Sequence, residues 1–222
     1  IVGIRVPIMA AASNIQDPPH EELQPLINLY SQGQLQQALD QATEMLRQFP
    51  RSVTLHNICG AAHAELWQFD AAIESYKQAI KIKPDYPLSY NNMGIALKEK
   101  GDLDAAIDSY KIALKIKPDY AEAYNNIGNA LKDKGDLDAA VDSYKQALKI
   151  KPDFTQAYYN LGISLQEKGE PEAAIDSYKQ ALKIKPDYVG AYNNMGVALQ
   201  DKGDLEAALD SYKQALKIKP DY

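Results

Sequence analysis

The sequence predicts an all-α fold, a solenoid of about six antiparallel helix pairs. Proline and glycine both recur at intervals of 34 residues. The prolines are Pro50, Pro84, Pro118, Pro152, Pro186 and Pro220, and the glycines are Gly60, Gly94, Gly128, Gly162 and Gly196. Within each period, apolar residues recur at i, i+3, i+4 and i+7, which is the spacing of one helix face. A fixed period of this length is typical of a repeat architecture.

We place the start of each repeat two residues after a Pro-Asp step, behind an N-terminal extension of residues 1–18. The repeats are 19–52, 53–86, 87–120, 121–154, 155–188 and 189–222, of which 19–52 is degenerate. The chain does not begin with methionine, and Met9 is a candidate native start. Residues 1–8 would then come from an expression vector.

Each repeat is expected to contain two helices separated by a glycine turn. In 87–120, the stripe that includes Tyr90, Gly94 and Leu97 predicts the first helix. Gly101 is expected to end it in the left-handed conformation that glycine adopts cheaply, and Asp102 is expected to cap the second helix. One such pair cannot bury its own apolar faces, so stacking on neighbouring pairs must bury them.

The residue types at fixed positions carry a family resemblance. Residues 90, 93, 94, 97, 106, 110, 113 and 118 are Tyr, Met, Gly, Leu, Ala, Tyr, Ala and Pro. This order closely resembles the signature of the tetratricopeptide repeat family. The resemblance is strong over 53–222 and weak over 19–52, where Leu26 replaces the glycine and Ala42 the aromatic residue. It implies a right-handed superhelix with a concave groove.

One face of each first helix is polar or variable and lies opposite the packing stripe. The resemblance implies that this face lines the groove, where we expect a peptide to bind. The candidate peptide-binding residues are Asn91, Asn92, Ile95, Asn125, Asn126, Asn129, Tyr159, Asn160, Ile163, Asn193, Asn194 and Val197.

Asparagine recurs on this face although it costs about 0.5 kcal/mol against alanine inside a helix. Its amide offers both donors and an acceptor to a peptide backbone. The arrangement resembles the asparagine ladder in the tetratricopeptide half of O-linked N-acetylglucosamine transferases. The alternative is that recent duplication copied an asparagine without a ligand role.

The composition disfavours nucleic acid and membranes as partners. The net charge is −6, whereas both of those partners need a basic surface. No apolar run approaches the roughly 18–20 residues that cross a bilayer. The single cysteine, Cys59, cannot form an internal disulfide, so we expect a reducing, cytoplasmic location.

No residue pattern predicts catalysis or a cofactor. His56, Cys59 and His63 share one helix face, but they occupy packing positions, so packing is favoured over a metal site. Trp67 replaces the turn glycine in its repeat. There either the turn changes or the ring packs over the outer surface, where it would form a second contact site.

We therefore expect a protein–protein interaction scaffold that binds an extended peptide or partner segment in the groove. One alternative is a structural solenoid that assembles into homo-oligomers through its open ends, because the last helix retains apolar residues such as Leu209 and Leu216. The other is the substrate-targeting part of a larger enzyme such as a glycosyltransferase.

Overall fold

The structure is a computed structural model that describes residues 17–220. The predictions about residues 1–16, including the start at Met9, lie outside the described part of the chain. The described residues form two compact units, with the boundary between Pro118 and Asp119. The helices of the N-terminal unit are α1 (His20–Ser31), α2 (Leu35–Gln48), α3 (Val53–Glu65), α4 (Phe69–Ile82), α5 (Pro87–Lys100) and α6 (Leu103–Ile116). Those of the C-terminal unit are α7 (Ala121–Asp133), α8 (Leu137–Ile150), α9 (Thr155–Glu167), α10 (Pro171–Ile184), α11 (Val189–Asp201) and α12 (Leu205–Ile218).

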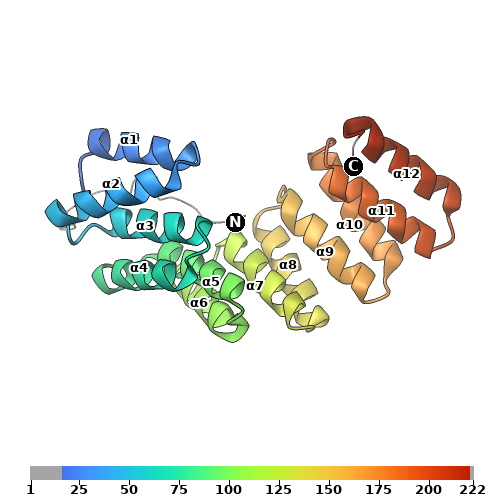
Figure 1. Cartoon of the computed structure of the whole chain (residues 1–222). Helices are drawn as coiled ribbons and strands as arrows, with labels where there is room; N and C mark the ends of the chain where they lie inside the picture. Colours follow the sequence, from blue (N-terminus) through green and yellow to red (C-terminus); the bar gives the residue numbers. More distant parts are fainter. Residues whose placement is uncertain (1–16, 221–222) are drawn as a thin grey trace. The chain divides into compact units, whose positions relative to one another are not determined.

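The predicted all-α repeat solenoid is confirmed. Within each unit, every helix packs against the next one along the chain (Figure 1). Except for α1 and α2, the two helices of one pair, such as α9 and α10, make the most extensive contacts. The pair then packs on its neighbour, for example through α10 and α11. Of the helices that the structure describes, none is long and apolar enough to span a bilayer.

The turn between the two helices of a pair uses a left-handed residue. Gly101 has φ +96°, as expected, and the glycines at the same position of other repeats also have positive φ. Trp67 adopts this conformation too, with φ 62°. Its repeat therefore keeps the usual turn, and the indole is left 73% exposed beside Phe69.

Glycine allows the two helices of a pair to approach closely. A Cβ atom on Gly94 would lie 2.5 Å from Cε1 of Tyr110, and the same geometry recurs between Gly128 and Tyr144. Both tyrosine side chains are completely buried. The second helix thus places a large ring where the first helix has no side chain, which explains the glycine and tyrosine at these positions.

The second helices begin at the predicted residues, although their caps differ. Asp136 and Asp204 each accept a hydrogen bond from the backbone N–H three residues later, at 3.2 Å. Asp102 stands at the same position but makes no such side-chain bond. The predicted capping by Asp102 is therefore wrong in detail, because the residue starts the helix without capping its N–H groups.

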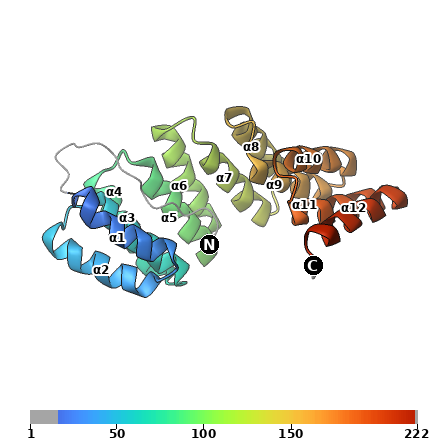
Figure 2. The same cartoon turned by 90° about the horizontal axis from the view of Figure 1, so that it is seen from above.

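The first helices lie on the inner side of each stack. In the C-terminal unit α9 contacts both α7 and α11, and in the N-terminal unit α3 contacts α5 (Figure 2). No comparable contact joins second helices of neighbouring repeats within residues 17–220. Because the first helices approach one another more closely, each stack curves towards them. Their free face is therefore the concave one in each unit.

Candidate peptide-binding site

The predicted site residues of α5 are buried. Asn91 and Asn92 are 1% and 0% exposed, and Ile95 is also buried. Helix α5 contacts α3, α4 and α6. These three side chains are therefore not open to solvent in this structure, and a peptide-binding role for them stays a prediction.

In the C-terminal unit, asparagine amides bond to one another across neighbouring repeats. Asn160 on α9 donates through Nδ2 to Oδ1 of Asn125 at 3.1 Å and to Oδ1 of Asn129 at 2.9 Å, both on α7. Gln156 in turn donates to Oδ1 of Asn160 at 2.9 Å. Asn125 and Asn160 are buried, whereas Asn129 is partly exposed. These amides therefore link α7 to α9, a structural role that the sequence analysis missed.

Sequence spacing could have revealed this link. Asn125 and Asn160 stand at neighbouring positions of consecutive repeats, and Asn129 lies one helical turn after Asn125. Stacked first helices bring such positions together. The asparagine series by itself suggested only a peptide role or duplication. Asn126, Asn193 and Asn194 remain partly exposed, so a ligand role for them stays a prediction.

Tyr159 packs between repeats and faces the groove only in part. Its ring centroid lies 4.7 Å from that of Tyr188, and its hydroxyl accepts a hydrogen bond of 3.1 Å from Nδ2 of Asn194. A Cβ atom on Gly190 would lie 3.1 Å from the same hydroxyl. The glycine on α11 thus makes room for the tyrosine on α9.

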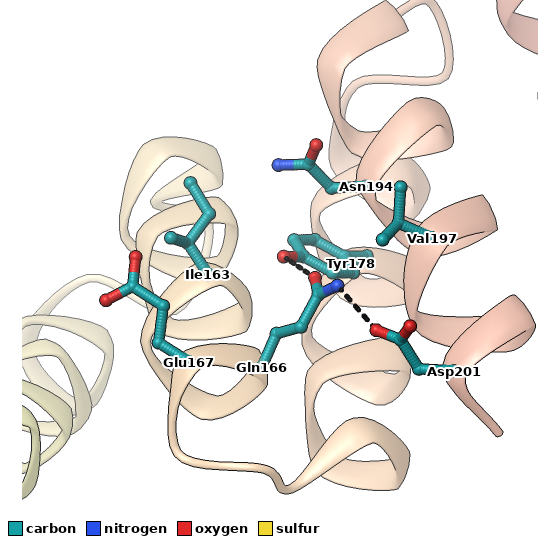
Figure 3. Close-up of a pocket in the computed structure, with 7 residues that line it drawn as sticks. All are labelled: Ile163, Gln166, Glu167, Tyr178, Asn194, Val197 and Asp201. Atoms are coloured by element: carbon teal, nitrogen blue, oxygen red, sulfur yellow. Dashed lines mark hydrogen bonds between the residues drawn. The ribbon is translucent and has the colours of Figure 1, made fainter.

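A pocket of about 370 Å³ opens between α9 and α11 (Figure 3). Its lining consists of Ile163, Gln166 and Glu167 from α9, Tyr178 from α10, and Asn194, Val197 and Asp201 from α11. The predicted Ile163, Asn194 and Val197 are thus brought together. The other four lining residues were not predicted as site residues. Three of them lie on the face already assigned to the groove, whereas Tyr178 occupies a core position.

Hydrogen bonds fix the polar floor of this pocket. The hydroxyl of Tyr178 donates to Oε1 of Gln166 at 3.1 Å, and Nε2 of Gln166 donates to Oδ2 of Asp201 at 3.2 Å (Figure 3). Burial raises the pKa of Tyr178 above its usual 10.0, so the phenol is a neutral donor at physiological pH. The amide of Gln166 therefore holds α9 to α11 across the pocket.

The residues considered for a metal site serve packing and local hydrogen bonding. Cys59 is buried in the apolar core around α1, α2 and α3, which confirms the packing interpretation. His63 bonds through Nδ1 to Oε1 of Gln68, and His56 through Nε2 to the Pro50 carbonyl. Within the described part of the chain, no three His, Cys, Asp or Glu side chains form a group that could hold a metal ion.

Comparison with known proteins agrees with this geometry. A family model described as TPR repeat matches residues 60–101, 96–135, 128–169 and 165–203, and one described as tetratricopeptide repeat matches 189–222. A search of curated protein sequences found no significant match. The fold and the concave helix face define a helical-repeat scaffold protein. The chain belongs to the tetratricopeptide repeat family.

Several solved structures resemble this chain. A crystal structure of MamA is 30% identical and covers 72% of this chain and 94% of its own, with a TM-score of 0.66. YrrB, described as a TPR protein with an unusual peptide-binding site, is 19% identical over 82% of this chain and 93% of its own, with a TM-score of 0.63. The Cut9–Hcn1 structure from the APC/C gives a TM-score of 0.77 at 18% identity, over 92% of this chain and 41% of that chain. The last two show likeness of fold alone.

Proposed function

We propose that this interaction scaffold binds an extended segment of a partner protein on the concave face of its C-terminal unit. The observation that carries the proposal is the pocket between α9 and α11, which combines the aliphatic side chains of Ile163 and Val197 with amide groups. Apolar anchors set among a few oriented polar groups are typical of peptide-binding surfaces. The scaffold itself needs no catalytic group for this role.

Val197 supports this location because it is 36% exposed at the pocket, although it is aliphatic. Asn194, one helical turn before it, orients the pocket edge through its bond to Tyr159. A segment lying across α9 and α11 would cover both aliphatic side chains. Burying that apolar surface contributes about 25 cal/mol per Å² before the cost of ordering the segment.

A pool of random decapeptides displayed on phage tests the proposal with the full chain as bait. Peptides selected by the unmodified chain should bind at least about tenfold more weakly to the double variant Ile163→Gln and Val197→Gln. The matched control is Ile112→Gln with Ile184→Gln, two aliphatic residues that are each 38% exposed but lie on second helices outside the pocket. Equal loss in both variants, or no selectable peptide, would refute the proposal.

Self-association through α12 is a second candidate function. Leu209 and Leu216 are 54% and 48% exposed, whereas Ile175 and Leu182, at the same positions of α10, are buried against the following repeat. Helix α12 thus presents the kind of surface that accepts a further first helix. A second copy of the chain could supply one.

Light scattering over a range of concentrations tests this second candidate. If copies associate through α12, the average mass rises with concentration, and Leu209→Gln with Leu216→Gln abolishes the rise. A mass that stays at one chain throughout would exclude it. This outcome is independent of peptide binding at α9 and α11.

A further inference from the structure

The pocket between α9 and α11 has aliphatic walls at one end and carboxylates at the other. Ile163 and Val197 occupy equivalent positions of the two helices and lie on opposite sides of the opening (Figure 3). Glu167 and Asp201 also occupy equivalent positions and flank the lower end in that view. A side chain entering here would meet hydrocarbon first along its stem and negative charge at its tip.

The helix ends add to the negative potential at this position. Glu167 is the last residue of α9 and Asp201 the last of α11, and neither helix has a basic residue in its last turn. A helix C-terminus carries a partial negative charge, so an acidic side chain is slightly unfavourable there and a cation is favourable. Each of these two helices therefore ends with the partial negative charge of its C-terminus and a carboxylate, and its last turn contains no basic side chain.

Earlier repeats neutralise the same acid with a neighbouring lysine. An acid stands at the repeat position of Glu167 and Asp201 in each of the four first helices α5, α7, α9 and α11, and the residue before it is Lys98, Lys132, Gln166 and Gln200, respectively. Nζ of Lys98 lies 3.3 Å from the Glu99 carboxylate, and Nζ of Lys132 lies 3.2 Å from that of Asp133. The exchange of lysine for glutamine coincides with the repeats that form the pocket.

The lysines that follow α9 and α11 are held in ion pairs elsewhere. Lys168 lies 2.7 Å from the Asp138 carboxylate and 2.9 Å from that of Glu170. Lys202 lies 3.6 Å from the carboxylate of Glu172. Among residues 17–220, no lysine or arginine forms an ion pair with Glu167 or Asp201. Asp201 accepts a hydrogen bond from the neutral amide of Gln166, and both carboxylates are exposed to solvent.

The geometry points to a partner segment that carries a lysine or arginine side chain, which this pocket receives. The inference rests on the proposed function and names the partner's chemistry. The methylene stem lies between Ile163 and Val197, since long basic side chains cover apolar surface while their heads remain solvated. The cationic head lies near Glu167 and Asp201, where charge-assisted hydrogen bonds favour it.

The phage-selected decapeptides provide the probe for this inference. We expect Lys or Arg to be enriched in them, and replacement of that residue by norleucine or citrulline in a synthetic peptide to weaken binding about fivefold at low salt. The variant Gln166→Lys with Gln200→Lys should weaken binding by a similar factor. It restores the residue that α5 and α7 already carry, so it is compatible with the repeat fold.

Substitutions of the carboxylates separate this inference from the proposed function. Glu167→Gln with Asp201→Asn should reduce both the preference for basic peptides and its salt dependence, whereas Glu74→Gln with Asp108→Asn, on second helices of the N-terminal unit, should change neither. Peptides that depend on Ile163 and Val197 but show no preference for a basic residue would overturn the inference and leave the proposed function standing. Failure to select any peptide would overturn both. Circular dichroism melting of each variant confirms that its fold is intact.

Discussion

At the scale of single residues, this fold depends on positions where the backbone conformation or a neighbouring ring restricts which side chain can be accommodated. Five turn glycines and Trp67 adopt positive φ, and four helical glycines sit against buried tyrosine rings. These four are Gly60, Gly94, Gly128 and Gly162. A left-handed residue with a Cβ atom costs about 1–2 kcal/mol. A Cβ atom against a fixed ring cannot be accommodated without a shift of the helix. Trp67 and Gly128 allow these two effects to be measured separately.

Trp67→Gly is expected to raise the free energy of unfolding by about 1 kcal/mol, because the left-handed strain is removed. Little packing is lost, since the indole is 73% exposed and only its edge contact with Phe69, at 5.8 Å between centroids, disappears. Urea unfolding followed by circular dichroism measures the change. The matched reverse substitution, Gly101→Ala, should lower stability by a similar amount. If partner binding is unaltered in Trp67→Gly, the predicted second contact site is rejected as well.

Gly128→Ala is expected to lower the free energy of unfolding by about 1–3 kcal/mol. Helix propensity alone would favour alanine by about 1 kcal/mol, so the sign of the change identifies the clash with Tyr144 at 2.5 Å. Gly190→Ala is the control, because its Cβ atom would come no closer than 3.1 Å, to the hydroxyl of Tyr159, and a smaller loss is expected. Stabilisation by Gly128→Ala would show that the ring is not confined as described.

At the scale of helices and repeats, hydrogen bonds between polar side chains join neighbouring first helices, in addition to the packing of their apolar stripes. Asn160 bridges α9 to α7, and Gln166 bridges α9 to α11. Buried amides must be paired, because each unpaired one costs the desolvation free energy of the group. Such pairing specifies which faces meet as well as stabilising the stack.

Asn160→Ala is expected to lower the free energy of unfolding by about 1–3 kcal/mol, because it leaves the amides of Asn125 and Asn129 without this partner. Asn194→Ala removes one bond from a partly exposed side chain and should cost less than about 1 kcal/mol. Urea midpoints of the two variants are compared directly. Unchanged stability with reduced peptide affinity in Asn160→Ala would favour the asparagine ladder over the structural role.

At the scale of the whole molecule, burial of ionisable groups makes the free energy of unfolding decrease as the pH becomes alkaline. Burial raises the pKa of Cys59 from 9.0 to about 11 and that of Tyr30 from 10.0 to about 12. It also raises the pKa of Tyr76, Tyr144 and Tyr178. These groups lie in both units. Above pH 9 the unfolded chain therefore binds fewer protons than the folded chain, and stability falls as pH rises.

The urea midpoint is accordingly expected to be nearly constant from pH 7 to pH 9 and to fall progressively between pH 9 and pH 12. Absorbance at 295 nm should show tyrosine ionisation delayed relative to the chain in guanidinium chloride. At pH 8, the Cys59 thiol should react with iodoacetamide much more slowly in the folded chain than in the unfolded one. A midpoint that is unchanged up to pH 12 would contradict the assigned burial.

The sequence by itself determined the helix pairs, the 34-residue period and the family, because glycine, proline and apolar spacing act on the local backbone and on the next repeat. Gly101 and Asp102 mark their turn without any knowledge of distant contacts. Tertiary structure decided which groove residues remain open. Asn91 and Asn160 carry the same side chain as the partly exposed Asn194, but their burial depends on how closely neighbouring helices stack. The pocket formed by Ile163 and Asp201 likewise depends on the distance between α9 and α11, which the amide of Gln166 spans.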